Sequence, residues 1–298
     1  MTTFAGFPQN TRIALVGCGD IGCRLAEKLM AAGAEVHGLR RNIAALPANV
    51  IPHATDVQNP AALSILHDIA FDYVVVTLSP TEMSDAAYAA TYVQGLRNIL
   101  SVLNSRRLRK LFWISSTSVY GQSDGSVVDE YSATNPIQYS GQRQLEAEQL
   151  LNSLKNKACI VRFSGIYRDG RHRLVEQICS GKISRHIEND YMTNRIHIAD
   201  CVGVLEHLIK LDASGASLEP VYLASDSSPV LYSDLIHWLA TKMNITLPDS
   251  ADSNTPRVGS KHCNNALLLA SGYQFIYPTY KEGFRSIIYS LGSDNSSS

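Results

Sequence analysis

The chain reads RIALVGCGDIG over residues 12–22, and this segment is the strongest single indication of its architecture. Residues 12–16 form a short apolar, β-branched run that predicts a buried strand. A helical pattern follows over residues 21–32, with Gly33 placed to end it. A strand, a turn with the spacing G-x-G-x-x-G and a helix, in that order, open a βαβ unit. The segment therefore predicts a parallel sheet with its first crossover helix.

The same alternation continues along the next 140 residues. Further strands are expected at 35–39, 50–54, 72–78, 110–115 and 158–163, and helices at about 60–69, 85–106 and 138–155. Right-handed crossovers would place these helices on both faces of the sheet. The fold class expected is α/β, a doubly wound parallel-sheet Rossmann fold with a smaller C-terminal lobe.

The regular alternation ends after Gly165, which indicates a second lobe. Here the pattern predicts helices at 173–180, 200–210 and 232–243, a strand at 221–224 and a short helix at 264–272. We expect residues 11–165, with 195–226 returning to them, to form the Rossmann domain. Residues 166–194 and 227–290 would form a small substrate lobe, and residues 291–298 a flexible tail.

Composition excludes several classes of protein. The 298 residues are 45% hydrophobic and 18% charged, which is enough apolar content for a packed core. A net charge of -1 provides no global field that would attract nucleic acid or an anionic membrane. The basic run at 106–110 is expected to be a solvated helix end, because cations there complement the helix dipole. No nucleic-acid or membrane partner is expected.

The cysteines suggest a reducing compartment. All six are scattered, with no C-x-x-C pair or other metal-ligand spacing, so we expect reduced thiols and no metal site. The first ten residues lack a secretory pattern, and no apolar run approaches the ~18 residues that a membrane span needs. A cytoplasmic protein is expected.

The glycine-rich turn has the chemistry of a dinucleotide site. Gly17 would make the tight turn, Gly19 would let the backbone approach a pyrophosphate, and Gly22 would let helix and strand pack closely. The phosphates would meet the amides at the helix N-terminus, where Asp20 and Ile21 lie. A glycine-rich turn without a ligand is the alternative.

The end of the second expected strand indicates which dinucleotide binds. NAD sites place a carboxylate there for the ribose hydroxyls, whereas this chain has Arg40 and Arg41. A guanidinium pairs with a 2′-phosphate through charge and bidentate geometry. NADP is therefore favoured over NAD, unless both arginines point into solvent.

These motifs together resemble the extended short-chain dehydrogenase/reductases, the NAD(P)-dependent epimerase/dehydratase group, over about residues 12–285. The resemblance implies that Asp56, with Val57, touches adenine. It also implies that the end of the fourth strand packs on the cofactor through Thr77, Leu78 and Ser79. A homodimer through the helices at 85–106 and 138–155 is implied by the same analogy.

The resemblance also implies an active site. The run Ser115-Ser116-Thr117-Ser118-Val119-Tyr120-Gly121 resembles the family segment S-S-x-x-V-Y-G, whose second serine is the catalytic hydroxyl, here Ser116. The family pairs a tyrosine with a lysine four residues later on one helix face. Here Tyr139 and Arg143 match that spacing. A second alignment instead places Ser140 and Gln144 at these positions, and the catalytic pair is then absent.

The substrate is a small molecule of unknown identity. Sugar-nucleotide members often carry an arginine four residues before the histidine of an H-x-x-D motif, but that position is Thr193 here. Arg195 and Arg171 are the two candidates to substitute for it. His197 and Asp200 of the motif are expected to be structural. We expect an NADP-dependent oxidoreductase or epimerase, with a sugar nucleotide as the family default. The alternative is a non-catalytic NADP(H)-binding sensor or partner-binding protein.

Overall fold

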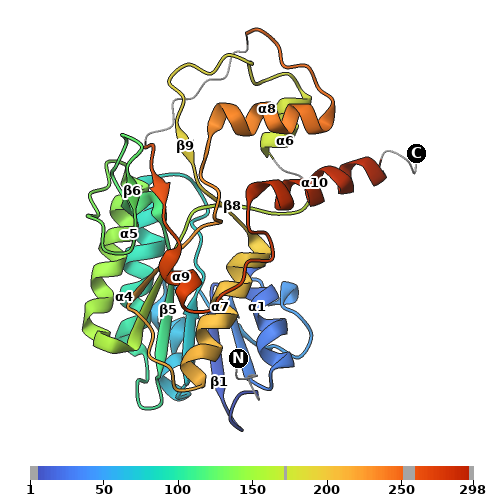
Figure 1. Ribbon diagram of the computed structural model, residues 1–298. Helices are drawn as coiled ribbons and strands as arrows, with labels where there is room; N and C mark the ends of the chain where they lie inside the picture. The colour runs from blue at the N-terminus through green and yellow to red at the C-terminus, as the bar shows by residue number, and fades with distance from the viewer. Residues whose placement is uncertain (1–5, 171–172, 251–258, 295–298) are drawn as a thin grey trace. The chain divides into compact units, whose positions relative to one another are not determined.

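The computed structural model describes residues 6–170, 173–250 and 259–294 (Figure 1). The described residues form two compact units. The first runs to Val119 and also includes Thr134–Arg162 and Cys201–Tyr222. The second comprises Tyr120–Ala133, Phe163–Asp200 and the described residues from Leu223 onward. All the predicted cofactor-binding residues and all three proposed catalytic side chains therefore belong to the first unit.

A seven-stranded parallel sheet organises the chain, which confirms the expected Rossmann fold. Its order is β11-β7-β5-β4-β1-β2-β3. The strands are β1 (Arg12–Val16), β2 (Glu35–Arg40), β3 (Ile51–Ala54), β4 (Tyr73–Val76), β5 (Lys110–Ser116), β7 (Ala158–Phe163) and β11 (Val221–Ala224). All four residues of β4 are buried, as expected for a central strand covered on both faces.

Helices cover both faces of this sheet. Figure 1 shows α4 (Gly95–Val102) and α5 (Tyr139–Leu150) along one face, and α1 (Asp20–Ala31) and α7 (Ile198–Ala213) along the other. The core under α4 and α5 combines Leu96, Ile99 and Ala147 with inward residues of the strands such as Val74 and Trp113. The apolar stripe of each helix thus explains the layer in which it lies.

Three expected helices are interrupted in the structure. The helix predicted at 138–155 consists of α5, which ends at Leu150, and a 3₁₀ segment, η5 (Leu151–Lys157). The helix predicted at 85–106 consists of α3 (Asp85–Tyr88), a π-helical segment η3 (Ala89–Gln94) and α4, and it ends at Val102. The helix predicted near 60–69 is a 3₁₀ turn, η2 (Pro60–Leu63), followed by α2 (Ile65–Asp68). Pro60 stands at the start of that turn, where its missing amide is harmless.

The second unit has its own apolar core. Its helices include α6 (Arg173–Cys179), α8 (Tyr232–Met243) and α10 (Tyr280–Asp294), and residues such as Val175, Leu239 and Phe284 pack between them. Short strand pairs join β8 (Gly165–Tyr167) to β10 (Arg195–His197), β9 (Met192–Thr193) to β12 (Val230–Leu231), and β6 (Val127–Val128) to β13 (His262–Cys263). The short helix α9 (Ala266–Ala270) lies where the pattern predicted one.

Helix α10 corrects the expected tail. It continues to Asp294, so the first four residues of the predicted flexible segment 291–298 are helical, and residues 295–298 lie outside the described residues. Glu282 accepts a hydrogen bond from the Thr279 backbone at 3.0 Å and another from the Thr279 hydroxyl. This Thr-x-x-Glu arrangement is a helix-start signal, and it indicates that a helix begins at about Tyr280.

The described residues contain no helix long and apolar enough to cross a membrane. Within the same part of the chain, no group of three or more His, Cys, Asp or Glu side chains is arranged to hold a metal ion.

Candidate functional site

The candidate site lies at the carboxyl edge of the sheet, where the strand order reverses between β1 and β4. In open α/β sheets, ligands bind in the crevice at such a switch point. The glycine loop (17–22) follows β1, residues 77–79 follow β4, and Ser116 ends β5. All of these segments belong to the first unit. The topology therefore gathers the predicted cofactor residues at one edge.

Packing within the protein explains two of the three loop glycines. Gly17 has φ = +78°, and a Cβ there would lie 2.8 Å from Leu78 Cδ2. A Cβ on Gly22 would lie 3.2 Å from both Cys18 Sγ and Thr77 Oγ1. Gly17 therefore requires the absence of a side chain, and a side chain at Gly22 would require Cys18 or Thr77 to shift by a few tenths of an ångström.

Gly19 is different, because the protein itself leaves room for a side chain there. Its φ is −86°, and the nearest atom to an added Cβ is the Gly17 carbonyl oxygen at an ordinary 3.6 Å. A glycine here suits a backbone whose ψ of −148° lies outside the usual extended region, and it also allows another molecule to approach closely. A pyrophosphate is such a molecule, so the loop fits a dinucleotide.

Helix α1 begins directly after this glycine. Asp20 is its first residue, and Ile21 is half-buried behind it. The first amides of any α-helix lack a carbonyl partner four residues earlier, so they can donate to a phosphate. The Asp20 carboxylate accepts a hydrogen bond from Arg24 Nε at 2.8 Å, and this ion pair partly neutralises the negative charge beside the loop.

Arg40 is brought to the glycine loop. Its Nη1 donates a hydrogen bond of 2.9 Å to the Cys18 carbonyl oxygen, and its side chain is half-buried. Arg41 is exposed. The structure thus separates the two predicted arginines, and only Arg40 is held beside the loop that would carry the cofactor.

The remaining predicted cofactor residues lie on neighbouring turns. Thr77 Oγ1 donates to the Gly17 carbonyl at 2.7 Å, and Leu78 packs against Gly17, so both brace the glycine loop. Asp56 accepts a hydrogen bond from the Gln58 backbone at 3.0 Å, and Val57 packs against Gly95 of α4. Ser79 is exposed. Their contacts with a cofactor stay a prediction.

The hydroxyl of Ser116 stands at the end of β5 and is half-buried. Its Oγ accepts a hydrogen bond of 3.1 Å from the Ser118 amide. The preceding residue, Ser115, is anchored by a 2.6 Å hydrogen bond to Glu148 of α5. Glu148 in turn accepts two hydrogen bonds from Arg162, of 3.0 and 2.7 Å. This buried network fixes the strand end that carries Ser116.

The predicted Tyr139–Arg143 pair has other partners in the structure. The Tyr139 ring packs edge-on against Tyr88, with centroids 5.3 Å apart. Arg143 makes two hydrogen bonds to Asp85, of 2.7 and 3.0 Å, and one to Glu146 of 2.8 Å. The hydrogen bond from Arg143 holds the pKa of the Asp85 carboxyl below its usual value. Among the described residues, no hydrogen bond joins Tyr139 to Arg143.

The alternative alignment also has support in the packing of α5. A Cβ on Gly141 would lie 2.1 Å from the Ser118 carbonyl oxygen, so the helix is pressed against the turn that follows Ser116. Gln144 is buried beside Tyr92, whose pKa burial raises to about 12. Gln144, and not Arg143, therefore occupies the buried face of the helix. Both alignments stay predictions.

Sequence reasoning missed the contributions of Asp85 and the tyrosines of the preceding helix. Asp85 follows the cap residue Ser84, whose side chain accepts a hydrogen bond from the Ala87 amide. That Ser-Asp pair signals a helix start but not a partner for Arg143, which lies 58 residues further along the chain. The contact could not be read from local spacing.

The second unit contains the residues considered for substrate binding. Thr193 is buried and donates to the Val230 carbonyl at 3.1 Å, and Arg195 lies with its guanidinium 5.8 Å from the centre of the Phe284 ring. Asp200 is buried and accepts hydrogen bonds from Tyr273, Ile276 and Tyr277, which is the structural role expected. Arg171 lies outside the described residues.

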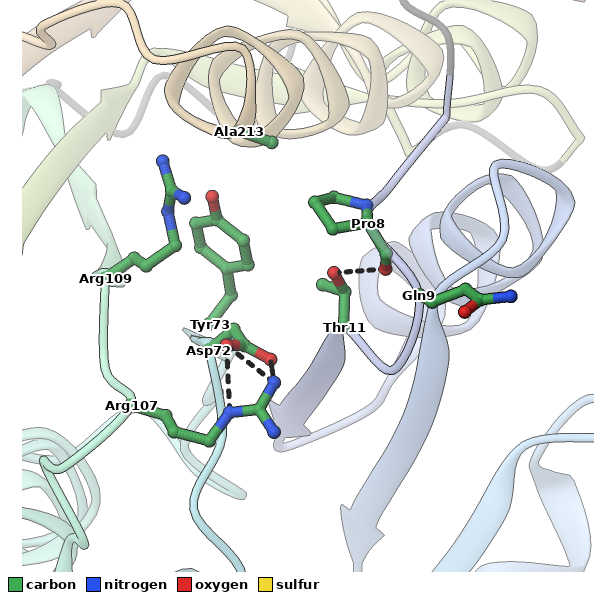
Figure 2. Close-up of a pocket in the computed structure, with 8 residues that line it drawn as sticks. All are labelled: Pro8, Gln9, Thr11, Asp72, Tyr73, Arg107, Arg109 and Ala213. Atoms are coloured by element: carbon green, nitrogen blue, oxygen red, sulfur yellow. Dashed lines mark hydrogen bonds and ion pairs between the residues drawn. The ribbon is translucent and has the colours of Figure 1, made fainter.

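The basic run at 106–110 does not lie at a helix end, since α4 ends before it, but Arg106, Arg107 and Arg109 are exposed, as expected for a solvated run. Arg107 donates to both carboxylate oxygens of Asp72, and Arg109 pairs with Asp212 at 3.1 Å. Figure 2 shows both arginines beside a pocket of about 140 Å³ at the amino end of β4. These cations serve the fold. The pocket lies at the edge opposite the glycine loop.

Together, the sheet order, the glycine loop and its helix define a nicotinamide-dinucleotide-binding Rossmann protein. The model of the NAD dependent epimerase/dehydratase family matches residues 13–194. A solved structure from Methylobacillus flagellatus, named as a candidate NAD-dependent epimerase/dehydratase, is 37% identical with a TM-score of 0.80, over 94% of this chain and 98% of that one. The chain belongs to the NAD dependent epimerase/dehydratase family.

Two further proteins are similar to this chain. Protein YeeZ of Escherichia coli is 26% identical over 90% of this chain and 96% of its own. The structure of UDP-glucuronic acid 4-epimerase from Bacillus cereus in complex with NAD is 18% identical, with a TM-score of 0.76 over 95% of this chain and 99% of that one. The latter likeness is one of fold alone. The family binds a nicotinamide cofactor.

Proposed function

We propose that this protein is an NADP(H)-dependent oxidoreductase or epimerase that acts on a nucleoside-diphosphate sugar or a related hydroxyl compound. One observation carries the proposal: Arg40, the last residue of β2, donates a hydrogen bond to the carbonyl of Cys18 inside the glycine loop. A cation at this position stands where the adenosine ribose of a bound dinucleotide would lie.

The preference for NADP follows from the chemistry of that cation. A guanidinium has five donors and no acceptor, so it favours a 2′-phosphate over two ribose hydroxyls. Within the described residues, Arg40 hydrogen-bonds the Cys18 carbonyl and lies 3.9 Å from the Cys23 sulfur. Both are neutral, so a phosphate would be the first anion to pair with Arg40.

A bound nicotinamide would supply the hydride chemistry, and the chain would orient the substrate and move the proton. Ser116, fixed by the Ser115–Glu148–Arg162 network, would donate a hydrogen bond to the reacting oxygen. Tyr139, at the start of α5, would take or return the hydroxyl proton. The substrate class rests on relatives whose names include a UDP-sugar epimerase.

Calorimetric titration with NADPH and NADH tests the cofactor. The wild type should bind NADPH more tightly, and Arg40→Ala should lose about 10- to 100-fold in NADPH affinity while NADH affinity changes little, as expected for one charge-assisted hydrogen-bonded contact. Arg97→Ala, on the exposed face of α4, is the matched control. Equal affinity for the two nucleotides in the wild type would contradict the assignment.

A second function is favoured by the contacts of α5. Arg143 is occupied by Asp85 and Glu146, and Gln144 takes the buried position, as the alignment without a catalytic pair requires. The protein would then be a non-catalytic NADP(H)-binding sensor. Tyr139→Phe separates the two: loss of hydride transfer from a panel of UDP-sugars to NADP⁺, with unchanged NADPH affinity, supports the enzyme. Wild-type protein that binds NADPH and transfers no hydride supports the sensor.

A further inference from the structure

Two cysteine sulfurs meet inside the candidate cofactor loop. Cys18 lies between Gly17 and Gly19, and Cys23 lies on the first turns of α1. Their Sγ atoms are 3.9 Å apart, in van der Waals contact. The six cysteines were expected to be unrelated thiols, so this pair is a consequence of how the loop turns into the helix.

The two thiols differ in access to solvent. Cys18 is fully buried beneath the loop, and burial, with Cys23 next to it, raises its pKa to about 12. Cys23 is half-buried, and its thiol donates to the Cys18 carbonyl at 3.4 Å. A dissolved oxidant would therefore reach Cys23 first, with Cys18 held in contact as the second sulfur.

Arg40 ties this pair to the cofactor. The same Nη1 that donates to the Cys18 carbonyl lies 3.9 Å from Cys23 Sγ. The thiol pair, the loop backbone and the cation proposed to bind the 2′-phosphate thus form one contact cluster.

We propose that Cys18 and Cys23 form a reversible disulfide under peroxide, and that this disulfide weakens NADP(H) binding. The second part rests on the proposed function. In the first step, the Cys23 sulfur bonds to one oxygen of hydrogen peroxide, the O–O bond breaks and water leaves, so Cys23 becomes a sulfenic acid. The Cys18 sulfur then attacks that sulfur, the S–O bond breaks and a second water carries away the Cys18 proton. Two thiols are oxidised and one peroxide is reduced to two waters.

Closing the bond changes the shape of the loop. A disulfide requires the sulfurs to approach from 3.9 Å to about 2.05 Å. The backbone that carries the two sulfurs is held by hydrogen bonds: the Gly17 and Cys18 amides donate to the Leu39 carbonyl oxygen at 2.9 and 3.3 Å, and the Cys23 amide donates to the Gly19 carbonyl oxygen at 2.8 Å. Bringing the sulfurs together therefore strains the backbone at Cys18 or the first turn of α1. Movement at either place displaces amides proposed to meet the phosphates, and disturbs the carbonyl that holds Arg40.

Reciprocity follows from thermodynamic linkage. If the disulfide lowers NADPH affinity by some factor, bound NADPH disfavours the disulfide by the same factor. Saturating NADPH should therefore protect the pair from oxidation.

Peptide mapping provides a test of the disulfide that does not depend on the cofactor. Trypsin should release both cysteines in one peptide, residues 13–24. After brief peroxide treatment and unfolding, both cysteines of this peptide should resist alkylation. Dithiothreitol should make both of them reactive toward the alkylating reagent again. Exposed Cys179 of α6 is the matched lone thiol. Finding Cys23 oxidised while Cys18 still alkylates fully would overturn the proposal.

Calorimetry then tests the consequence for the cofactor. With peroxide removed, oxidised wild type should bind NADPH at least about tenfold more weakly than the reduced protein, and dithiothreitol should restore affinity. Cys23→Ser should show the same affinity before and after peroxide. If the disulfide forms but NADPH affinity is unchanged, only the proposed effect of the disulfide on NADP(H) binding is overturned. Reduced protein that binds no NADPH overturns the proposed function as well, whatever the peptide map shows.

Discussion

The guanidinium of Arg143 donates two hydrogen bonds to the carboxylate of Asp85, of 2.7 and 3.0 Å. Arg143 lies on α5 and Asp85 begins α3, so the ion pair joins the two helices. Arg143, which the family spacing pairs with Tyr139, is thus compensated by carboxylates from Asp85 and Glu146. This relationship decides how a substitution at Arg143 should be interpreted.

Arg143→Gln should leave the fold intact. The Arg143 side chain is 33% exposed and the Asp85 side chain 51% exposed, and ion pairs of this kind add little to stability. We expect the melting temperature to shift by no more than about 2 °C. Loss of hydride transfer in this variant would then report on chemistry, measured as reduction of NADP⁺ by the UDP-sugar panel. A melting temperature far below that of Arg97→Gln would show that Arg143 is structural instead.

The loop glycines should respond differently to alanine. Gly19→Ala meets only an ordinary contact at 3.6 Å, so it should melt like the wild type and lose NADPH binding. Gly22→Ala presses against Cys18 and Thr77 at 3.2 Å and should cost about 1–3 kcal/mol of unfolding free energy. Thermal melts and calorimetry on both variants check this. Normal NADPH affinity in Gly19→Ala would remove the argument for a pyrophosphate at this position.

The buried ion pair beneath Ser116 should be costly to break. The side chains of Arg162 and Glu148 are 7% and 4% exposed. Glu148→Leu leaves a buried guanidinium without its carboxylate, and should cost about 3–5 kcal/mol in urea unfolding. Glu148→Leu combined with Arg162→Met should cost less than that single variant. Additive losses across this double-mutant cycle would mean that the two side chains are not coupled.

Asp226 should make stability depend on pH. It is buried after β11, and burial raises its pKa to about 7, although Arg195 opposes the shift. Its Oδ2 accepts no hydrogen bond from the described residues. Because the folded-state pKa lies above the unfolded value near 3.8, the folded protein binds the proton more tightly. Stability from this group is therefore present at low pH and is lost as pH rises toward 7.

Asp226→Asn removes that dependence. The variant should gain stability over the wild type by a few kcal/mol at most as pH rises from about 5 to 8. Urea unfolding of both proteins at each pH provides the difference, in which the other titrating groups cancel. A constant difference across this range would show that Asp226 keeps its charge throughout.

The expected elements of the nucleotide-binding half agree well with the structure, because each carries a local signal. β1, α1 and β7 lie within a residue of their predicted ends. Helix α10 was not predicted, although the Thr279–Glu282 pair before it is a helix-start signal. The helix predicted at 85–106 extends too far because its period continues past Val102 into a loop held by tertiary ion pairs.

The sequence by itself determined the Rossmann fold and the dinucleotide loop. Strand and helix periods and glycine spacing express local backbone geometry, and neighbouring residues specify that geometry. Only the tertiary structure decided which charges and sulfurs meet. It pairs Arg143 with Asp85 and Arg109 with Asp212, and it brings the sulfurs of Cys18 and Cys23 into contact. Such contacts depend on how separate elements pack, or on how a loop turns into a helix. The spacing of residues along the chain does not encode them.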